Sequence, residues 1–246
     1  MKPPLQLPRG GETAAEVPPR GDLEGVAIPC CYLAPVSHYS AYYRADEVRL
    51  EVCDHFVKQT LRNRCYIDSP NGALALTIPV VKPEGKTLMK DIRISDHGNW
   101  RHQHWVALES SYRQSPFFEY YADDFTPFYE KRWEFLADFN EELMELVASL
   151  LDIQKPITRT TSYSPTKFSG PTPIPALVGR GAVTTPDSFI SGRTICSPPY
   201  KGGVGGGSGG SVAVYYQVFA SRHGFLPDLS IVDLLFNQGP EGVLWL

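Results

Sequence analysis

The chain has 246 residues, 42% of them hydrophobic, which is enough for one large domain or two small ones. Its formal net charge of −4 argues against a nucleic-acid-binding surface, because phosphate binding needs a concentrated stripe of basic residues. The sequence holds no apolar run of about 18 residues, the length at which a segment becomes a candidate membrane span, so no such span is expected.

The N-terminus and the cysteines both bear on where the protein works. Residues 1–25 are rich in proline, glycine and charge, so they are predicted to form a disordered leader rather than a secretory signal. The cysteines are odd in number and form no C-x-x-C pair: Cys30, Cys31, Cys53, Cys65 and Cys196. We therefore expect neither a disulfide framework nor a zinc site, and reduced thiols indicate a cytoplasmic protein.

The residues after the leader predict mainly strands. An apolar run over 25–35 predicts a buried strand, and helical spacing follows over 36–45. Charged and apolar residues alternate over 47–52 and again over 91–96, which predicts two half-buried strands. Two extended stretches flank a Pro-Asn-Gly turn within 62–80, and this pattern predicts a hairpin.

From Asn99 onward the pattern becomes helical. Asn99 can cap the first helix by accepting from its free amides, and Trp100, His104 and Leu108 then fall on one face. An aromatic helix is predicted after Pro116, and a long amphipathic helix follows over 131–151. Its carboxylates are expected to face solvent: Asp138, Glu141, Glu142 and Glu145.

The last third of the chain changes in composition. Residues 164–211 are dense in proline, glycine, serine and threonine, which is typical of a lid, a binding loop or disorder. The glycine-rich end of this stretch matches a dinucleotide fingerprint only because nearly every residue is glycine, so it is interpreted as a flexible tether. A strand or helix start is predicted over 212–225. The final helix is predicted to begin with a capping box of Ser230 and Asp233 and to stop at Gly239.

These elements predict an α/β fold, with a mixed α+β arrangement as the variant. A central mixed sheet from the N-terminal strands would be covered by the helices of 99–151 and by the C-terminal helix. We expect a single domain over 26–246, with a low-complexity loop at 164–211.

Residues 94–113 gather three histidines and two tryptophans. His102 and His104 lie about 200° apart around a helix axis, so they cannot share a metal ion, and no metal site is predicted. His104 shares the inner face with Trp100. It is either a core histidine with a hydrogen-bond partner or a general base, because imidazole exchanges protons near neutral pH.

Two further groups of residues have chemistry to offer. Cys31 could act as a nucleophile with His38, although small buried cysteines are common core residues. Lys58, Arg62 and Arg64 occupy alternate positions and would line one face of an extended segment. Such a face suits a carboxylate or phosphate group, or else forms a solvated strand edge.

Four segments together resemble the WbqC-like protein family: "YLAPVSHYSAYY", "HFVKQTLRNRCYI", the stretch from "DIRISDHGNWRHQHW" to "FLADFN", and "LSIVDLLFNQGPE". The resemblance is strongest to the short branch found in Bacteroides and its relatives. It covers 26–163 and resumes from 215. Longer members open with a His-Gln-Pro-x-Tyr motif, whereas the corresponding strand here reads "AIPCCYLAP". The matching positions are Asn63, Arg64, Asn99, Trp100, His104, Tyr112, Ser230, Asp233 and Asn237.

The resemblance implies a function in bacterial surface-polysaccharide (O-antigen) biosynthesis, as an acyl or aminoacyl transferase acting on an amino sugar or sugar nucleotide. In this hypothesis Lys58, Arg62 and Arg64 bind the anionic group, and His104 takes the proton from the attacking amine. The remaining substrate contacts are Asn63, Asn99, Trp100 and Tyr112. The activated acyl donor and any cofactor are unknown, since the sequence has no metal or dinucleotide motif.

Two alternatives stay open. A non-catalytic module could bind a carbohydrate or a protein through the aromatic segment 117–129. A hydrolase dependent on Cys31 is the weaker alternative. The position of the aromatic rings, buried or facing solvent, distinguishes the first alternative from a core helix.

Overall fold

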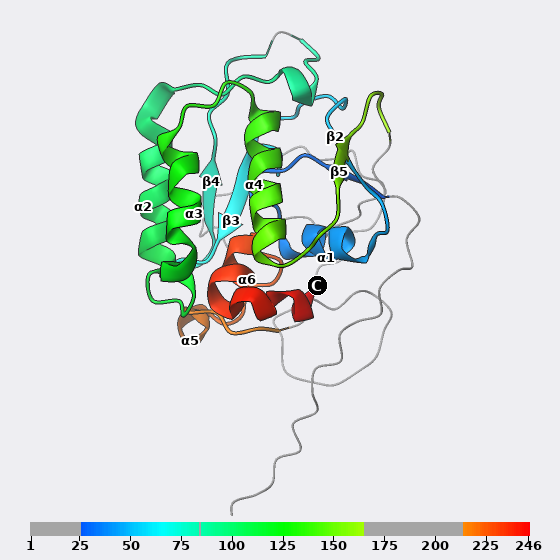
Figure 1. Ribbon diagram of the computed structural model, residues 1–246. Coiled ribbons are helices and arrows are strands. Elements are labelled where there is room, and N and C mark those ends of the chain that lie inside the picture. The colour runs from blue at the N-terminus through cyan, green and yellow to red at the C-terminus, as the bar shows by residue number, and fades with distance from the viewer. Residues whose placement is uncertain (1–25, 84, 165–213) are drawn as a thin grey trace, which may run out of the picture.

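The computed structural model describes residues 26–83, 85–164 and 214–246 (Figure 1). The predicted leader, 1–25, and nearly all of the low-complexity stretch at 164–211 lie outside the described residues.

Three strands form a parallel sheet. β1 (Val26–Pro29) pairs with β2 (Val48–Glu51), which pairs in turn with β5 (Ile157–Arg159). The helix α1 (Val36–Arg44) connects the first two strands, as a parallel pair requires a crossover. Pro35 at the start of α1 has no side-chain cap to offer, and Asp228 instead accepts from the Ser37 N–H at 2.8 Å.

Two further strands form the predicted hairpin. β3 (Arg64–Ile67) and β4 (Leu74–Thr77) pair antiparallel, and the turn places Gly72 at φ 99°, in the region that favours glycine. The strand predicted over 91–96 is wrong. This segment forms only isolated β-bridges, at Arg93 and Ile94. Its backbone forms hydrogen bonds alternately with residues 79–81 before it and residues 134–136 after it, so no continuous strand pairing develops. A 3₁₀ turn, η1 (Met89–Asp91), precedes it.

Three helices cover the hairpin side of the molecule. α2 (Trp100–Tyr112), α3 (Phe118–Glu130) and α4 (Leu136–Leu150) follow one another, and α2 packs against α3 (Figure 1). A 3₁₀ turn, η2 (His97–Asn99), leads into α2. Asn99 does not cap this helix as predicted: it adopts a left-handed conformation, φ 47°, whereas a capping residue needs extended backbone.

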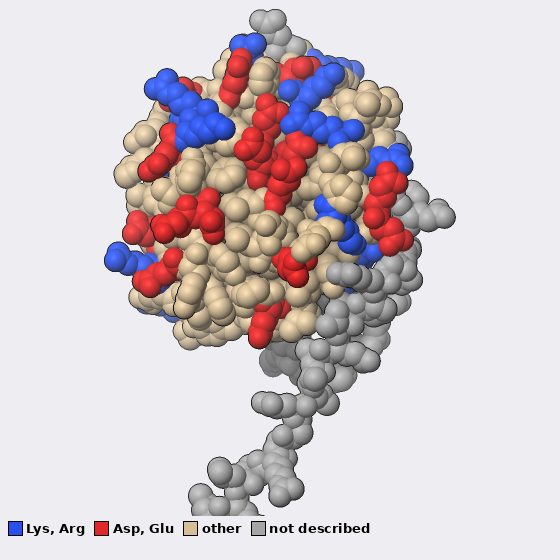
Figure 2. All heavy atoms as spheres, in the orientation of Figure 1, with Lys and Arg blue, Asp and Glu red and all other residues tan. Residues whose placement is uncertain are grey.

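The surface of α4 bears out the predicted solvent face at Glu142 and Glu145, which are exposed. In the orientation of Figure 1, Figure 2 shows acidic side chains gathered over the middle of this face of the molecule. Asp138 and Glu141 are half-buried instead, because both bind Arg159 at the end of β5.

The C-terminal part consists of α5 (Ala220–His223), α6 (Ile231–Gln238) and the 3₁₀ segment η3 (Gly239–Trp245). The predicted capping box of Ser230 and Asp233 is wrong, since the Ser230 hydroxyl donates to the Leu33 carbonyl at 2.8 Å. Gly239 ends α6 as predicted. Its φ is 62°, and a Cβ there would lie 2.6 Å from the Phe117 ring, so only glycine fits.

The mixed α/β class is thus confirmed, with its strands divided between a parallel sheet and an antiparallel hairpin. One hydrophobic core joins both sheets and the helices. Its largest fully buried side chains include Tyr32, Tyr39, Phe125, Phe139 and Phe236.

Candidate functional site

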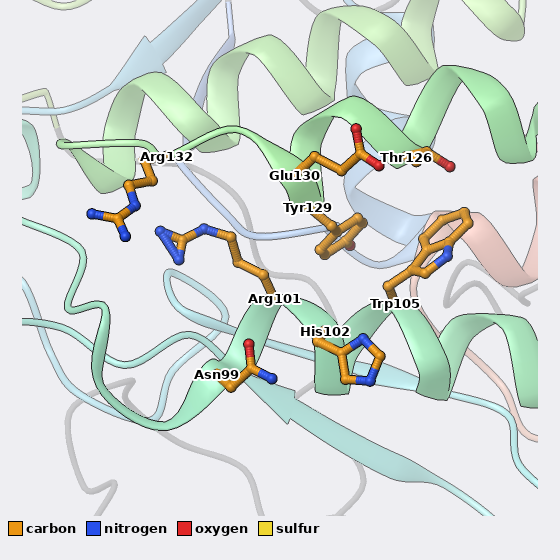
Figure 3. Close-up of a pocket in the computed structure, with 8 residues that line it drawn as sticks. All are labelled: Asn99, Arg101, His102, Trp105, Thr126, Tyr129, Glu130 and Arg132. Carbon is orange, nitrogen blue, oxygen red and sulfur yellow. The ribbon is translucent and has the colours of Figure 1, made fainter.

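A cavity of about 330 Å³ opens between the N-terminal end of α2 and the C-terminal end of α3. Figure 3 shows one wall formed by residues of the first helix and the facing wall formed by residues at the end of the second. The volume falls within the range of small-molecule sites. The lining residues are Asn99, Arg101, His102, Trp105, Thr126, Tyr129, Glu130 and Arg132.

A chain of hydrogen bonds leads from the cavity wall into the core. The Tyr129 hydroxyl lies 2.9 Å from the Tyr32 hydroxyl, which lies 3.0 Å from Nδ1 of His104. All three side chains are buried, and the His104 ring also packs against Tyr32 and Trp100. The chain fixes the ring of Tyr129, the one member of the three that lines the cavity.

His104 is neutral at physiological pH. Burial lowers its pKa from 6.5 to about 4, and a hydrogen bond with the Thr77 backbone acts weakly in the opposite direction. A neutral imidazole has one N–H and one acceptor nitrogen, so with the Thr77 bond in place Nδ1 accepts from the Tyr32 hydroxyl. The side chain is 5% exposed and does not line the cavity.

Two guanidinium groups share one carboxylate at an end of the cavity. Arg101 and Arg132 both bind Asp96, which contacts Arg132 at 3.6 Å through its second oxygen. The side chain of Arg101 is 13% exposed and its guanidinium lies 5.2 Å from the Trp100 ring centre. Arg132, at 83% exposure, is nearly free in solvent.

Other polar groups of the cavity are available for a ligand. The side chains of Glu130, His102 and Asn99 are exposed and have no hydrogen-bond or ion-pair partner among the described residues. Trp105 is half-buried, and its ring contacts those of Phe118 and Tyr129. The cavity therefore offers an acid and an imidazole that have no partner among the described residues, beside the exposed part of the Trp105 ring.

The predicted cation cluster lies elsewhere and does not line the cavity. Lys58 is exposed, and Arg62 bonds to the buried Asp54, with Nε at 3.0 Å. Arg64 donates to the Thr77 hydroxyl across the hairpin at 2.8 Å. Asn63 uses its side chain to join two backbone segments, donating to the Ile78 carbonyl at 2.9 Å.

Of the remaining predicted contacts, only Asn99 lines the cavity. Trp100 is 3% exposed and packs behind Arg101. Tyr112 is 1% exposed, accepts from the Asp68 N–H at 3.0 Å and donates to Asp233 at 2.9 Å. These two side chains belong to the interior, between helices.

Cys31 and its predicted partner are both buried. Burial raises the pKa of the Cys31 thiol to about 12 and lowers that of the His38 imidazole to about 3. At neutral pH the thiol thus keeps its proton, and the thiolate is the reactive form.

The aromatic segment 117–129 is mostly core. Phe118, Phe125 and Tyr129 are buried, whereas Tyr120 is 78% exposed. The described residues thus present no cluster of fully exposed rings on this helix that could serve as a stacking platform.

Within 26–83, 85–164 and 214–246, no three His, Cys, Asp or Glu residues come together as a metal ion would need. In the same part of the chain no helix combines the length and apolar character of a membrane span.

Sequence reasoning missed most of the cavity. Arg101 and Trp105 are four residues apart on α2, and Thr126, Tyr129 and Glu130 share one face of α3. Helical spacing alone could have grouped each set. Only the packing of α2 against α3 brings the two sets together.

The cavity and its hydrogen-bonded chain lie inside the part of the sequence that matches a known family. A family model described as "WbqC-like protein family" matches residues 31–174. The uncharacterized protein Rv1507c of Mycobacterium tuberculosis is 28% identical over 204 residues, which cover 76% of this chain and 81% of that protein. No solved structure matches the chain. By the extent of the family match, this chain belongs to the WbqC-like protein family.

Proposed function

We propose that this protein binds an amino sugar or sugar nucleotide in the cavity between α2 and α3 and transfers an acyl or aminoacyl group to its amine. The observation that carries the proposal is that Glu130 and His102, beside the ring of Trp105, have no partner among the residues that the structure describes. In this proposal the reaction belongs to surface-polysaccharide biosynthesis, as the resemblance to WbqC-like proteins implies, and the reduced cysteines favour the cytoplasm as its location.

Each of the cavity residues can make a specific contact with such a ligand. The apolar face of a sugar ring can lie against Trp105, while the Glu130 carboxylate receives the amine through a charge-assisted hydrogen bond. Asn99 supplies an amide for the sugar hydroxyls. The chain of hydrogen bonds through Tyr32 to His104 fixes the position of Tyr129, and this gives the cavity wall around Tyr129 a fixed shape.

The chemistry needs a base and an activated acyl donor. The neutral amine attacks the carbonyl carbon of a thioester or ester donor, the C–N bond forms, and the C–S or C–O bond breaks. The imidazole of His102 takes the proton that the amine loses and then gives this proton to the departing thiolate or alkoxide. His102 is an exposed residue of the wall formed by α2, where a donor entering from solvent can reach the amine.

His104, predicted as the base, acts in this proposal as a positioning residue. With a pKa of about 4, protonating it at neutral pH costs about 4 kcal/mol. Its contribution is to hold Tyr32, and through it Tyr129, in place.

Binding is tested with glucosamine 1-phosphate by isothermal titration calorimetry. Glu130→Gln should weaken binding about tenfold, which corresponds to about 1.4 kcal/mol. Glu142→Gln is the matched control, an exposed glutamate on α4 away from the cavity, and should bind as the wild type does. Equal affinity of the wild type and Glu130→Gln would remove the proposed site.

Transfer is tested by mass spectrometry of the same sugar incubated with a panel of acyl-coenzyme A and aminoacyl donors. Once a donor gives acylated product, His102→Gln should lower kcat about 100-fold with little change in sugar affinity. His55→Gln, an exposed histidine that does not line the cavity, should leave kcat unchanged. Binding without product across the panel would favour the alternative, a carbohydrate-binding module that uses the same cavity.

A further inference from the structure

The position of Asp96 between two arginines raises a question about what else the cavity binds. Asp96 is 51% exposed and is the common partner of Arg101 and Arg132. Figure 3 shows the guanidinium groups of these arginines facing one another at one end of the cavity, with Trp105 at the other end. The carboxylate of Asp96 therefore occupies the position between two guanidiniums where an anionic ligand would bind.

Arg101 is built into this end of the cavity. Its guanidinium packs against the Trp100 ring, and its side chain is largely buried. Asp96 binds one terminal nitrogen, while the buried Nε–H has no hydrogen-bond partner among the described residues. A buried donor without a partner is costly, and the side-on fork of Nε–H and a terminal N–H can donate two parallel hydrogen bonds to a phosphate or carboxylate.

Arg132 is the opposite case. It follows α3, is almost fully exposed, and its 3.6 Å contact with Asp96 is longer than a hydrogen bond. Such an exposed contact contributes little to stability, so this side chain can turn toward a ligand at small cost. One rigid guanidinium and one adjustable guanidinium would then enclose an anion from two sides.

We propose that Arg101 and Arg132 form a phosphate-binding subsite and that Asp96 is an internal counter-ion which the phosphate displaces. The inference rests on the proposed function in that it supplies the anionic group of its sugar substrate. Once Asp96 is displaced, the two arginines and Glu130 leave a net charge of +1, which complements a ligand that carries a phosphate dianion and one protonated amine. Displacement of Asp96 frees a terminal nitrogen of Arg101, so that this nitrogen and the unpartnered Nε–H can donate together to the incoming anion.

The test is titration of inorganic phosphate at constant ionic strength, because this probe carries no amine and no sugar. Asp96→Asn keeps the size of the side chain and removes the competing charge, so phosphate should bind about tenfold tighter than to the wild type. Arg101→Lys keeps the charge but loses the fork, and should bind about tenfold weaker. Arg113→Lys, an exposed arginine at the far end of α2, is the control and should bind as the wild type does.

Equal or weaker phosphate binding by Asp96→Asn would overturn the subsite, as would wild-type affinity in Arg101→Lys. Arg132→Gln provides a second variant at an exposed position where folding is not at risk, and it should bind phosphate about threefold weaker. The outcome is separable from that of the proposed function. If Glu130→Gln leaves amino-sugar binding unchanged while Asp96→Asn still tightens phosphate, the transferase proposal fails and the subsite stands.

Discussion

Two polar clusters of this protein have opposite construction. In the cluster around Asp233 both carboxylate oxygens are used: Tyr112 donates to one, and Tyr215 and Gln217 donate to the other at 2.7 and 2.8 Å. In the cavity between α2 and α3, the carboxylate of Glu130 and the imidazole of His102 have no partner in the described structure.

The comparison shows where to look for function. Part of the family resemblance lies in buried residues at or beside Asp233 and its three donors, which we call the closed cluster. These residues make buried hydrogen bonds within or beside this cluster: Tyr112, Ser230, Asp233 and Asn237. Their hydrogen bonds join α2, α6 and the segment after residue 214, so they stabilise the fold and are not available to a ligand. A ligand gains most from groups whose hydrogen-bonding capacity is still open.

The largest expected effect is the loss of Asp233. Asp233→Ala leaves the donors of Tyr112, Tyr215 and Gln217 buried without an acceptor, so the free energy of unfolding should fall by about 3 kcal/mol or more. Urea denaturation at pH 6 measures it, with Asp123→Ala, an exposed aspartate of α3, as the control. A change below about 1 kcal/mol would contradict the closed character of this cluster.

His104 should behave as part of the fold. His104→Ala removes the acceptor of the Tyr32 hydroxyl and leaves space beside Trp100, which should lower the free energy of unfolding by about 2 kcal/mol. Thermal unfolding followed by circular dichroism detects this loss. An unchanged Tm with reduced turnover would instead restore His104 as the base.

The same two residues predict opposite pH dependence of stability. Burial raises the pKa of Asp233 from 3.8 to about 7, so its contribution is full below about pH 4 and is lost as the pH rises to 7. Burial lowers the pKa of His104 from 6.5 to about 4, so the folded state releases a proton that the unfolded chain keeps, and stability rises over that interval.

Denaturation of variants separates the two contributions. The stability of the wild type minus that of Asp233→Asn should fall between pH 4 and 7. The free energy of unfolding of the wild type minus that of His104→Gln should rise between pH 4 and 6.5. Differences that run in the same direction for both variants would show that one of the two environments is misassigned.

The smallest effect on stability is expected for the exposed charged and polar side chains of the cavity between α2 and α3. Glu130→Gln, His102→Gln and Arg132→Gln should each change the free energy of unfolding by less than about 0.5 kcal/mol, because none of these exposed side chains is packed in the core. Chemical denaturation of the three variants measures the change. A fall in the free energy of unfolding of more than about 1 kcal/mol would show that the side chain stabilises the fold, and this would argue against a role in ligand binding.

Periodicity in the sequence predicted the elements well, because burial of one face follows directly from spacing. The hairpin around Gly72 and the helices α2, α3 and α4 were all found in this way. Capping was predicted less well. Ser230 has the right side chain for a cap, but a carbonyl from residue 33, distant in the sequence, is a competing partner that no local pattern reveals.

The candidate site was harder to predict for the same reason. The cationic run at Lys58, Arg62 and Arg64 is compact in sequence, yet in the structure its members bond to neighbours or face solvent. Arg101 and Arg132 are 31 positions apart, and only the pairing of α2 with α3 brings them to one cavity. A long-range contact of this kind leaves no signal in a single sequence.

Comparison of two exposed cations tests this account most directly. The affinity for glucosamine 1-phosphate is measured by calorimetry in Arg132→Gln, at the cavity, and in Lys58→Gln, in the cluster predicted from sequence. We expect the first variant to bind about threefold weaker and the second to bind as the wild type does. Loss of affinity in Lys58→Gln with full affinity in Arg132→Gln would place the ligand outside the cavity and contradict the account.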